Sequence, residues 1–211
     1  MPKIVCLSDT HNFHAQIAVP DGDILIHAGD ATGRGTVEEV VSFNKWFAAL
    51  PHRHKIFVAG NHDWLFETNN RLARTLLDSS IHYLQDSFVE IENLKIYGSP
   101  WQPRFFDWAF NLMRGAELAE KWKLIPDQAD ILITHGPPFG ILDEVPRTYF
   151  IENTGCEELR KRVEEVRPKL HIFGHIHCGY GEAEEFGVKF INAANCDESY
   201  APVNAPITFE L

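Results

Sequence analysis

The chain repeats one hydrophobic pattern: a short apolar run, rich in β-branched residues, that ends in glycine or a polar side chain. The clearest example is the segment 23–30, DILIHAGD, in which four successive apolar or aromatic positions lead to Gly29 and Asp30. Short apolar runs bounded by turn residues are typical of buried strands. The other runs with this pattern are 3–7, 55–59, 131–134 and 171–173. We therefore expect buried strands that deliver polar groups at their C-terminal ends.

Helical periodicity fills the gaps between some of these runs. Thr36 and Glu39 form a capping-box signature before an amphipathic segment that should end near Leu50. Residues 69–79 are also predicted to be helical. The residues expected to face inward on the two helices are Val37, Val40, Val41, Trp46 and Phe47 on the first, and Leu72, Leu76 and Leu77 on the second.

The remaining pattern indicates a second sheet. Residues 88–91 and 94–97 alternate around a turn at 92–93 and are predicted to form a hairpin. Helices are expected near 115–123 and 156–166, and strands at 188–192 and 207–210. The strand–helix–strand order favours parallel pairing with right-handed crossovers. We predict an α/β fold: a four-layer α/β/β/α sandwich of two packed mixed sheets, with a site beyond the strand ends.

Length and charge narrow the functional classes. At 211 residues and 24.1 kDa, the whole chain, 1–211, is expected to form a single domain. A formal net charge of −11 argues against sequence-independent binding of long nucleic acid, which requires clustered lysine and arginine. Small anions remain acceptable ligands if a local positive centre, such as a metal ion, overrides the overall charge.

The cysteines and the N-terminus indicate a cellular setting. Cys6, Cys156, Cys178 and Cys196 form no C-x-x-C pair, so they are interpreted as reduced thiols. The chain starts with a strand-like segment instead of an apolar leader, and no apolar run approaches the length of a membrane span. We predict a cytoplasmic protein without a membrane partner.

The polar groups at the strand ends suit a metal centre. They are Asp9, His11, Asp30, Asn61, His62, His135, His175 and His177. Oxygen and imidazole ligands without thiolate suit manganese, iron, zinc and magnesium better than Cu⁺ or iron–sulfur clusters. Two divalent ions would bring a charge of +4 against −2 from Asp9 and Asp30. The surplus would attract an anionic substrate and lower the pKa of a bridging water.

The order Asp-x-His, Gly-Asp, Gly-Asn-His-Asp, Thr-His-Gly and Gly-His-x-His resembles the calcineurin-like metallophosphoesterase superfamily. The resemblance extends from Asp9 to His177. It implies one metal ion on Asp9, His11 and His177, a second on Asn61, His135 and His175, and Asp30 as the bridge between them. It also implies that His62 binds a phosphoryl oxygen and protonates the leaving group.

One position departs from that superfamily. Many of its phosphoprotein phosphatases carry a second aspartate three residues after the bridging one, to orient the catalytic histidine, whereas this chain has Gly33. The orienting partner of His62 is therefore left open. Strongly basic leaving groups should be harder to expel, so esters with better leaving groups, or strained cyclic phosphodiesters, fit better.

A narrower resemblance supports diesters. The segments 96–101, 110–111, 134–138 and 166–174 are similar to the metallophosphoesterase-domain-containing brain proteins and their bacterial relatives, which hydrolyse phosphodiesters including cyclic nucleotides. Some animal members have glycine at the position of His175, which cripples the second metal site. Because His175 is present here, the resemblance implies full metal occupancy.

Several residues have simpler interpretations. The other histidines are taken as core or surface residues: His14, His27, His52, His54, His82 and His171. The aromatic run 101–108 either caps the core or forms a wall that stacks a nucleobase or aryl group. Arg34, Arg104, Arg114 and Arg147 could each hold phosphate oxygens, although a solvated surface position is favoured for any one of them. The candidate substrate contacts are Asn61, His62 and Arg34. Asp63 is interpreted as a cap and Cys178 as packing.

The sequence thus predicts a binuclear metal-dependent phosphodiesterase that hydrolyses small phosphodiesters, such as 2′,3′- or 3′,5′-cyclic nucleotides, by attack of a metal-bridging hydroxide. Asp30 and His62 are the catalytic candidates. The cofactors are expected to be two divalent or mixed-valence ions, with manganese and iron favoured over zinc and magnesium. The alternatives are a phosphomonoesterase with the same metals and a non-catalytic scaffold. The sequence leaves the oligomeric state open.

Overall fold

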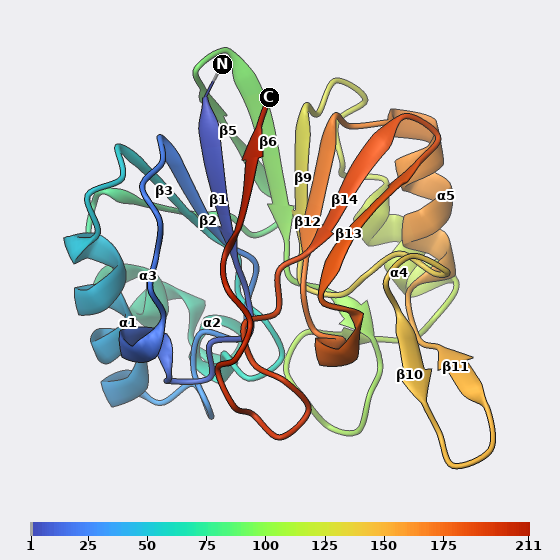
Figure 1. Ribbon diagram of the computed structural model, residues 1–211, viewed down its shortest axis with the longest axis horizontal. Helices are drawn as coiled ribbons and strands as arrows, with labels where there is room; N and C mark the ends of the chain where they lie inside the picture. The colour runs from blue at the N-terminus through green and yellow to red at the C-terminus, as the bar shows by residue number, and fades with distance from the viewer. Residues whose placement is uncertain (1) are drawn as a thin grey trace.

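Two β-sheets face each other between two groups of helices (Figure 1). The structure is a computed structural model that describes residues 2–211. The first sheet has the order β15-β1-β2-β3-β4, in which only β15 is antiparallel to its neighbour. Its strands are β1 (Lys3–Leu7), β2 (Ile24–His27), β3 (His54–Phe57), β4 (Ile81–Tyr83) and β15 (Ile207–Glu210).

The second sheet has the order β13-β14-β12-β9-β6-β5, with parallel strands at its centre and antiparallel strands at both edges. Its strands are β5 (Ser87–Ile91), β6 (Leu94–Ser99), β9 (Ile131–Thr134), β12 (Leu170–Phe173), β13 (Gly181–Glu185) and β14 (Val188–Asn192). Both sheets are mixed, as the sequence predicts.

Alternation along each strand builds three apolar layers. Ile4 and Ile26 face Ile133 and Ile172 of the other sheet, forming the layer between the sheets. The intervening residues, such as Val5, turn outward to the helices. Because successive side chains of a strand point to opposite faces, the central strands are apolar throughout and buried on both sides. This arrangement confirms the predicted four-layer sandwich.

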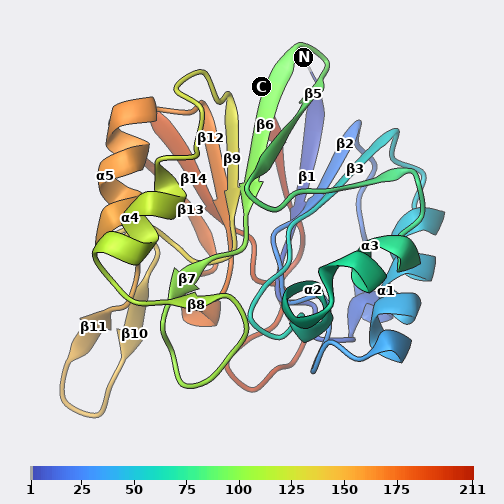
Figure 2. The same ribbon diagram turned by 180° about the vertical axis from the view of Figure 1, so that it is seen from behind.

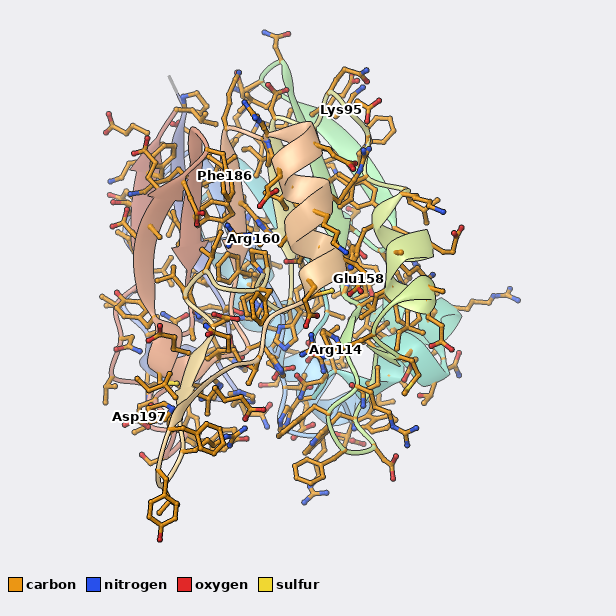
Figure 3. The ribbon with its side chains drawn as sticks, turned by 90° about the vertical axis from the view of Figure 1, so that its right-hand side faces the viewer. Lys95, Arg114, Glu158, Arg160, Phe186 and Asp197 are labelled. Atoms are coloured by element: carbon orange, nitrogen blue, oxygen red, sulfur yellow. The ribbon has the colours of Figure 1, made fainter. Side chains whose placement is uncertain are left out.

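Helices cover the outer face of each sheet, as the reverse view shows (Figure 2). The first sheet is covered by α1 (Val37–Ala49), α2 (Trp64–Thr68) and α3 (Asn70–Leu76). The second is covered by α4 (Ala116–Trp122) and α5 (Glu157–Val166). In Figure 3, α5 lies across the second sheet, where the Arg160 guanidinium is 5.1 Å from the centre of the Phe186 ring. None of the helices within residues 2–211 is both long and apolar enough to cross a bilayer.

The short elements lie around the strand ends. They are the pairs β7 (Gln102–Pro103) with β8 (Asn111–Leu112) and β10 (Glu144–Pro146) with β11 (Ile151–Asn153), and the 3₁₀ turns η1 (His14–Gln16) and η2 (His177–Gly179). The β10–β11 hairpin projects from the lower edge of the molecule in Figure 1. The sequence analysis missed these strands and β13.

The predicted capping box is confirmed at the start of α1. The Thr36 hydroxyl accepts from the Glu39 N–H, and the Glu39 carboxylate accepts from the Thr36 N–H. The predicted inward stripe is partly wrong, because Val37 is 38% exposed and the buried stripe includes Phe43, which the sequence analysis omitted. Val37 is the first residue of the helix, and the buried positions begin at Val40.

The helix predicted at 69–79 is shorter than expected, and α2 precedes it. Asn69 ends α2 and caps α3, where its side-chain oxygen accepts from the Leu72 N–H. Leu72 is 37% exposed and does not face inward, whereas Ala73 is fully buried. Ala73 belongs to the apolar cluster shared by these helices and the first sheet, which a count of large apolar residues does not reveal.

Candidate metal centre

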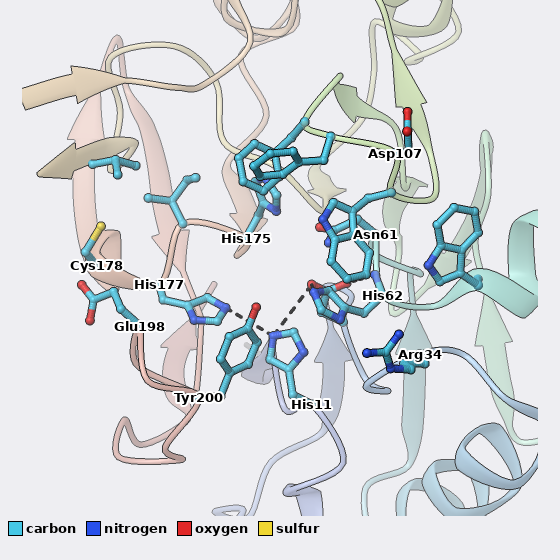
Figure 4. A pocket seen from close by; sticks show the side chains of 17 residues that line it. His11, Arg34, Asn61, His62, Asp107, His175, His177, Cys178, Glu198 and Tyr200 are labelled. Atoms are coloured by element: carbon cyan, nitrogen blue, oxygen red, sulfur yellow. Dashed lines mark hydrogen bonds and ion pairs between the residues drawn. The ribbon is translucent and has the colours of Figure 1, made fainter. Parts of the chain in front are cut away.

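The predicted polar groups converge at the C-terminal ends of parallel strands from both sheets. Asp9 and His11 follow β1, Asp30 follows β2, and Asn61 and His62 follow β3. The second sheet contributes His135 after β9, and His175 and His177 after β12. Most of these side chains line one cavity of about 980 Å³, shown in Figure 4. Asp9 and His135 are fully buried at its base.

One cluster contains Asp9, His11 and His177, whose ligand atoms lie within 4.8 Å of one another. His177 Nε2 is 3.4 Å from Asp9 Oδ1, and His11 Nε2 is 3.8 Å from the same oxygen. The two imidazole Nε2 atoms are 3.3 Å apart. One carboxylate and two ring nitrogens therefore point at a common volume.

A second cluster contains Asp30, His135 and His175. His135 Nε2 lies 3.4 Å from Asp30 Oδ2 and 2.9 Å from Asn61 Oδ1. Asp30 Oδ2 is also 3.8 Å from His11 Nε2, so the Asp30 carboxylate lies between the two clusters. The structure thus brings together all seven residues predicted as metal ligands.

Several of these residues have an unusual backbone conformation that sets the direction of their side chains. Asp9, His11, Asp30 and His175 all have positive φ, between 41° and 68°. Residues other than glycine rarely adopt this region, and such strain concentrates at functional sites. At Gly60, a Cβ atom would collide with the Asp30 carboxylate and the His135 ring. The glycine of the Gly-Asn-His motif is therefore needed for close approach of the backbone to the site.

Hydrogen bonds to backbone carbonyl oxygens hold two of the histidine rings in place. His135 Nδ1 donates to the Ala28 carbonyl at 3.0 Å, and His177 Nδ1 donates to the Asp197 carbonyl at 2.8 Å. These contacts place a proton on Nδ1 of each ring and direct Nε2 to the ligand clusters. Metal-binding histidines commonly have such an outer partner.

The pKa values of the four histidine ligand candidates shift in two directions, upward at His135 and His177 and downward at His11 and His175. Burial would lower the pKa of His135 and His177, but the Asp30 carboxylate beside His135 and the Asp9 carboxylate beside His177 raise each pKa to about 9. Burial dominates at His11 and His175, where the pKa falls to about 4 and about 3. The last two rings are therefore neutral and able to donate a lone pair.

The donor set fits two metal ions. Among the described residues, Asp9 Oδ1 is buried without a hydrogen-bond partner, which is costly unless another group satisfies it. Asp9, Asp30 and Asn61 supply oxygen, and four imidazoles supply nitrogen, as manganese, iron and zinc sites require. A cation at each cluster would turn these mutually crowded polar atoms into ligands.

His62 has a backbone partner in place of the expected carboxylate. Its Nδ1 lies 2.7 Å from the Gly33 carbonyl oxygen, at the position where the sequence comparison left the partner open. The ring stacks on Trp108, with centroids 4.2 Å apart, and its Nε2 lies 4.0 Å from Asp30 Oδ2. The His62 ring is thus held from two sides, with Nε2 directed to the metal centre.

The aromatic run 101–108 divides between a part packed away from the cavity and a part that lines it. Trp101 caps the structure away from the cavity, because its Nε1 donates to the Asp86 carboxylate and Lys121 lies 4.2 Å above its ring. Phe105, Phe106 and Trp108 line the cavity instead. The wall therefore comes from the second half of the run.

Two further residues line the cavity: Arg34, which was predicted from the sequence, and Tyr200, which was not. Arg34 lines the cavity, as its candidacy as a substrate contact requires. Tyr200 also lines it, with its ring 4.7 Å from that of His11, and the sequence analysis missed it. No periodicity or motif marks Tyr200, which lies beyond the last metal-ligand motif. The one local signal is the turn-forming Asp197-x-Ser199 pattern before it.

Asp63 occupies the N-cap position of α2, as the sequence predicts, but its side chain makes no capping hydrogen bond to that helix. Its buried carboxylate accepts from the N–H groups of Ala31, Thr32 and Gly60 and from the Thr32 hydroxyl. Burial and the negative charge of Asp30 raise the pKa of Asp63 to about 6, against the hydrogen bonds of Thr32 and Gly60. Asp63 therefore joins the loop that carries Asp30 to the loop that carries Asn61 and His62.

The residues given simpler interpretations lie outside the two clusters. The six other histidines belong to neither. Arg104, Arg114 and Arg147 pair with Asp107, Glu157 and Glu152. Cys178 is exposed at the cavity, where its Sγ donates to the Glu144 carbonyl.

Comparison with known proteins identifies the family. A family model described as calcineurin-like phosphoesterase matches residues 2–179. Metallophosphoesterase domain-containing protein 1 of human and of mouse are each 45% identical over 233 residues, covering 99% of this chain and 71% of theirs. The crystal structure of phosphopantetheinyl hydrolase from Mycobacterium tuberculosis has a TM-score of 0.61 at 15% identity, covering 90% of this chain and 88% of that one. The last comparison supports the fold, and the first two confirm the resemblance seen in the sequence: the chain belongs to the calcineurin-like phosphoesterase family.

Proposed function

We propose that this protein is a binuclear metal-dependent phosphodiesterase that hydrolyses small phosphodiesters. The observation that carries the proposal is the pair of ligand clusters joined at Asp30, at the base of a cavity of about 980 Å³. The proposed ligands are Asp9, His11 and His177 for one ion and Asn61, His135 and His175 for the other, with Asp30 between them. Manganese and iron are favoured, with zinc and magnesium as alternatives.

When bound, two cations would supply Lewis acidity and lower the pKa of a coordinated water, providing a nucleophile near neutral pH. The chain's own residues would orient the ester. His62 Nε2 faces the centre, where a protonated ring can donate to a phosphoryl oxygen and then to the departing oxygen. Arg34, on the cavity wall, offers a guanidinium to a second oxygen.

Two features support a diester over a monoester. A phosphodiester carries one negative charge, and among the cavity-lining residues Arg34 is the one arginine or lysine available to meet it. The Gly33 carbonyl also holds a protonated His62 less strongly than a carboxylate would, which favours leaving groups that need little protonation. Strained cyclic diesters and esters of acidic alcohols meet that condition.

The aromatic wall supports nucleotides as substrates. Phe105 and Phe106 are 46% and 74% exposed at the cavity, which leaves their ring faces available to a ligand. Stacking on an aromatic side chain stabilises a bound base by about 1–3 kcal/mol and tolerates any base. We therefore include 2′,3′- and 3′,5′-cyclic nucleotides among the proposed substrates.

A comparison of two nitrophenyl esters tests the reaction class. With manganese in matched excess, kcat/KM for bis(p-nitrophenyl) phosphate should exceed that for p-nitrophenyl phosphate by about tenfold or more. Such a ratio corresponds to about 1.4 kcal/mol or more of preferential transition-state stabilisation. A preference for the monoester would assign the same centre to a phosphomonoesterase. Turnover of neither ester by protein that binds two ions would indicate a scaffold.

Metal removal provides a test that does not depend on turnover. The proposed ligands come from both sheets, so bound ions should stabilise the sandwich as well as activate it. At a manganese concentration a hundred times the dissociation constant, each bound ion should raise the free energy of unfolding by about 2.7 kcal/mol. Calorimetry of chelator-treated and manganese-loaded protein measures the shift, and elemental analysis should give two ions per chain. One ion or none, with no shift in Tm, would contradict the proposal.

A further inference from the structure

A loop after β14 carries Tyr200 to the metal centre, outside the residues 2–179 that the family model matches. Asp197 shapes this loop, because its Oδ1 accepts from the Ser199 N–H and hydroxyl and from the Ala201 N–H, at 2.7–2.9 Å. Tyr200 sits at the top of the turn with φ of 62°, a conformation that bulky residues rarely adopt. The turn therefore fixes where the Tyr200 side chain points.

The same turn is connected to the proposed ligands. The Asp197 carbonyl accepts both the Tyr200 N–H, at 2.9 Å, and the His177 Nδ1–H, at 2.8 Å. The Tyr200 ring meets His11 edge-on at 4.7 Å between centroids and His177 at 5.4 Å. The centre of the His62 ring lies 6.1 Å from that of Tyr200. Tyr200 is thus placed by the group that also places a metal-ligand candidate.

The hydroxyl of Tyr200 is available to a ligand. In Figure 4 it points toward the space enclosed by His11, His175 and His177. Within residues 2–211 it has no hydrogen-bond partner, in contrast to Tyr180, whose hydroxyl donates to the Ala205 carbonyl at 2.9 Å. Tyr200 is 45% exposed, so its ring is partly covered while the cavity side remains open.

We propose that Tyr200 is a substrate-contacting residue whose phenolic O–H donates a hydrogen bond to a non-bridging oxygen of the phosphoryl group. The inference rests on the proposed function, because it requires a phosphoryl group at the metal centre. It adds a third donor, after His62 and Arg34, from the opposite wall of the cavity. A neutral donor suits a monoanionic diester, since it orients an oxygen without the charge that a dianionic monoester would call for.

The variant Tyr200→Phe tests the hydroxyl alone. In manganese-loaded protein, it should lower kcat/KM for bis(p-nitrophenyl) phosphate by about tenfold, the size expected for a hydrogen bond to a charged group. Calorimetric titration with inorganic phosphate should show binding weakened by a similar factor. Metal content and Tm should match those of the wild type. Tyr149→Phe is the matched control, because Tyr149 is 94% exposed at the tip of the β10–β11 hairpin.

The outcomes separate the two proposals. If Tyr200→Phe equals the wild type in turnover and phosphate binding, the hydrogen bond is excluded. If Tyr200→Phe is unaffected and Tyr200→Leu alone loses activity, the ring acts by packing, which also overturns the inference. If wild-type protein with two bound ions neither binds phosphate nor cleaves the ester, the proposed function fails together with the role of Tyr200.

Discussion

Replacing Asp30 with asparagine should reduce phosphodiester turnover by about a thousand-fold or more. The Asp30 carboxylate lies between the two ligand clusters, within 3.4 Å of His135 Nε2 and 3.8 Å of His11 Nε2. An amide of the same shape removes the negative charge that would hold both cations. A loss of about 4 kcal/mol of transition-state stabilisation, the scale expected of a metal centre, corresponds to that factor. Steady-state kinetics with excess manganese measures the effect.

The matched control for this variant is Asp107→Asn. Asp107 lines the same cavity, but its side chain is 91% exposed and pairs with Arg104 outside the clusters. Its replacement should leave turnover within a few-fold of wild type, as is usual for exposed substitutions. Elemental analysis should show fewer than two ions on the Asp30→Asn protein. Retention of two ions and at least a tenth of the wild-type rate would contradict the bridging role.

Replacing Asp63 with alanine should lower the free energy of unfolding by about 3 kcal/mol or more. The change leaves the N–H groups of Ala31, Thr32 and Gly60 buried without an acceptor, and each such loss costs about 1–3 kcal/mol. Asp63→Asn keeps one carbonyl oxygen and should fall between alanine and the wild type. Denaturation in urea with a chelator present measures the loss without any contribution from bound metal.

A control variant separates the loss of the Asp63 hydrogen bonds from a general effect of removing an acidic side chain on the free energy of unfolding. Asp107→Ala, at an exposed position, should change the free energy of unfolding by no more than about 0.5 kcal/mol. The m-value should stay constant across the series, so that shifts in midpoint report stability alone. Equal stability of Asp63→Ala and the wild type would show that the two loops keep their positions without this carboxylate.

The sequence predicted the sheets well because each buried strand carries its own signal. In β1, β2 and β9 the apolar run is short, continuous and bounded by polar groups, so both the element and its C-terminal edge can be read locally. The metal-ligand candidates were accessible for the same reason, since they follow those strands directly. Their chemical type and order then pointed to one edge of the sandwich.

What the sequence could not reveal depends on contacts between distant segments or on backbone atoms. The partner of His62 is the carbonyl oxygen of Gly33. Because every residue has a backbone carbonyl, the sequence does not show which one will be used. Tyr200 reaches the centre through the turn built by Asp197, far along the chain from the motifs. Leu72 was misplaced because Ala73, a residue with little hydrophobic signal, takes the buried position of α3.

The orientation of His62 has a consequence for the first helix. The Glu39 carboxylate that completes the capping box of α1 also accepts from the Arg34 N–H and from the Asn12 side chain. A side chain at Gly33 would press against Asn12 and Glu39, at 2.8 Å and 3.2 Å from its Cβ. One glutamate therefore anchors both a helix terminus and the 33–34 peptide, whose carbonyl is the partner of the His62 ring. In this protein, substitutions at the start of α1 made for thermal robustness would therefore also shift the support of the His62 ring.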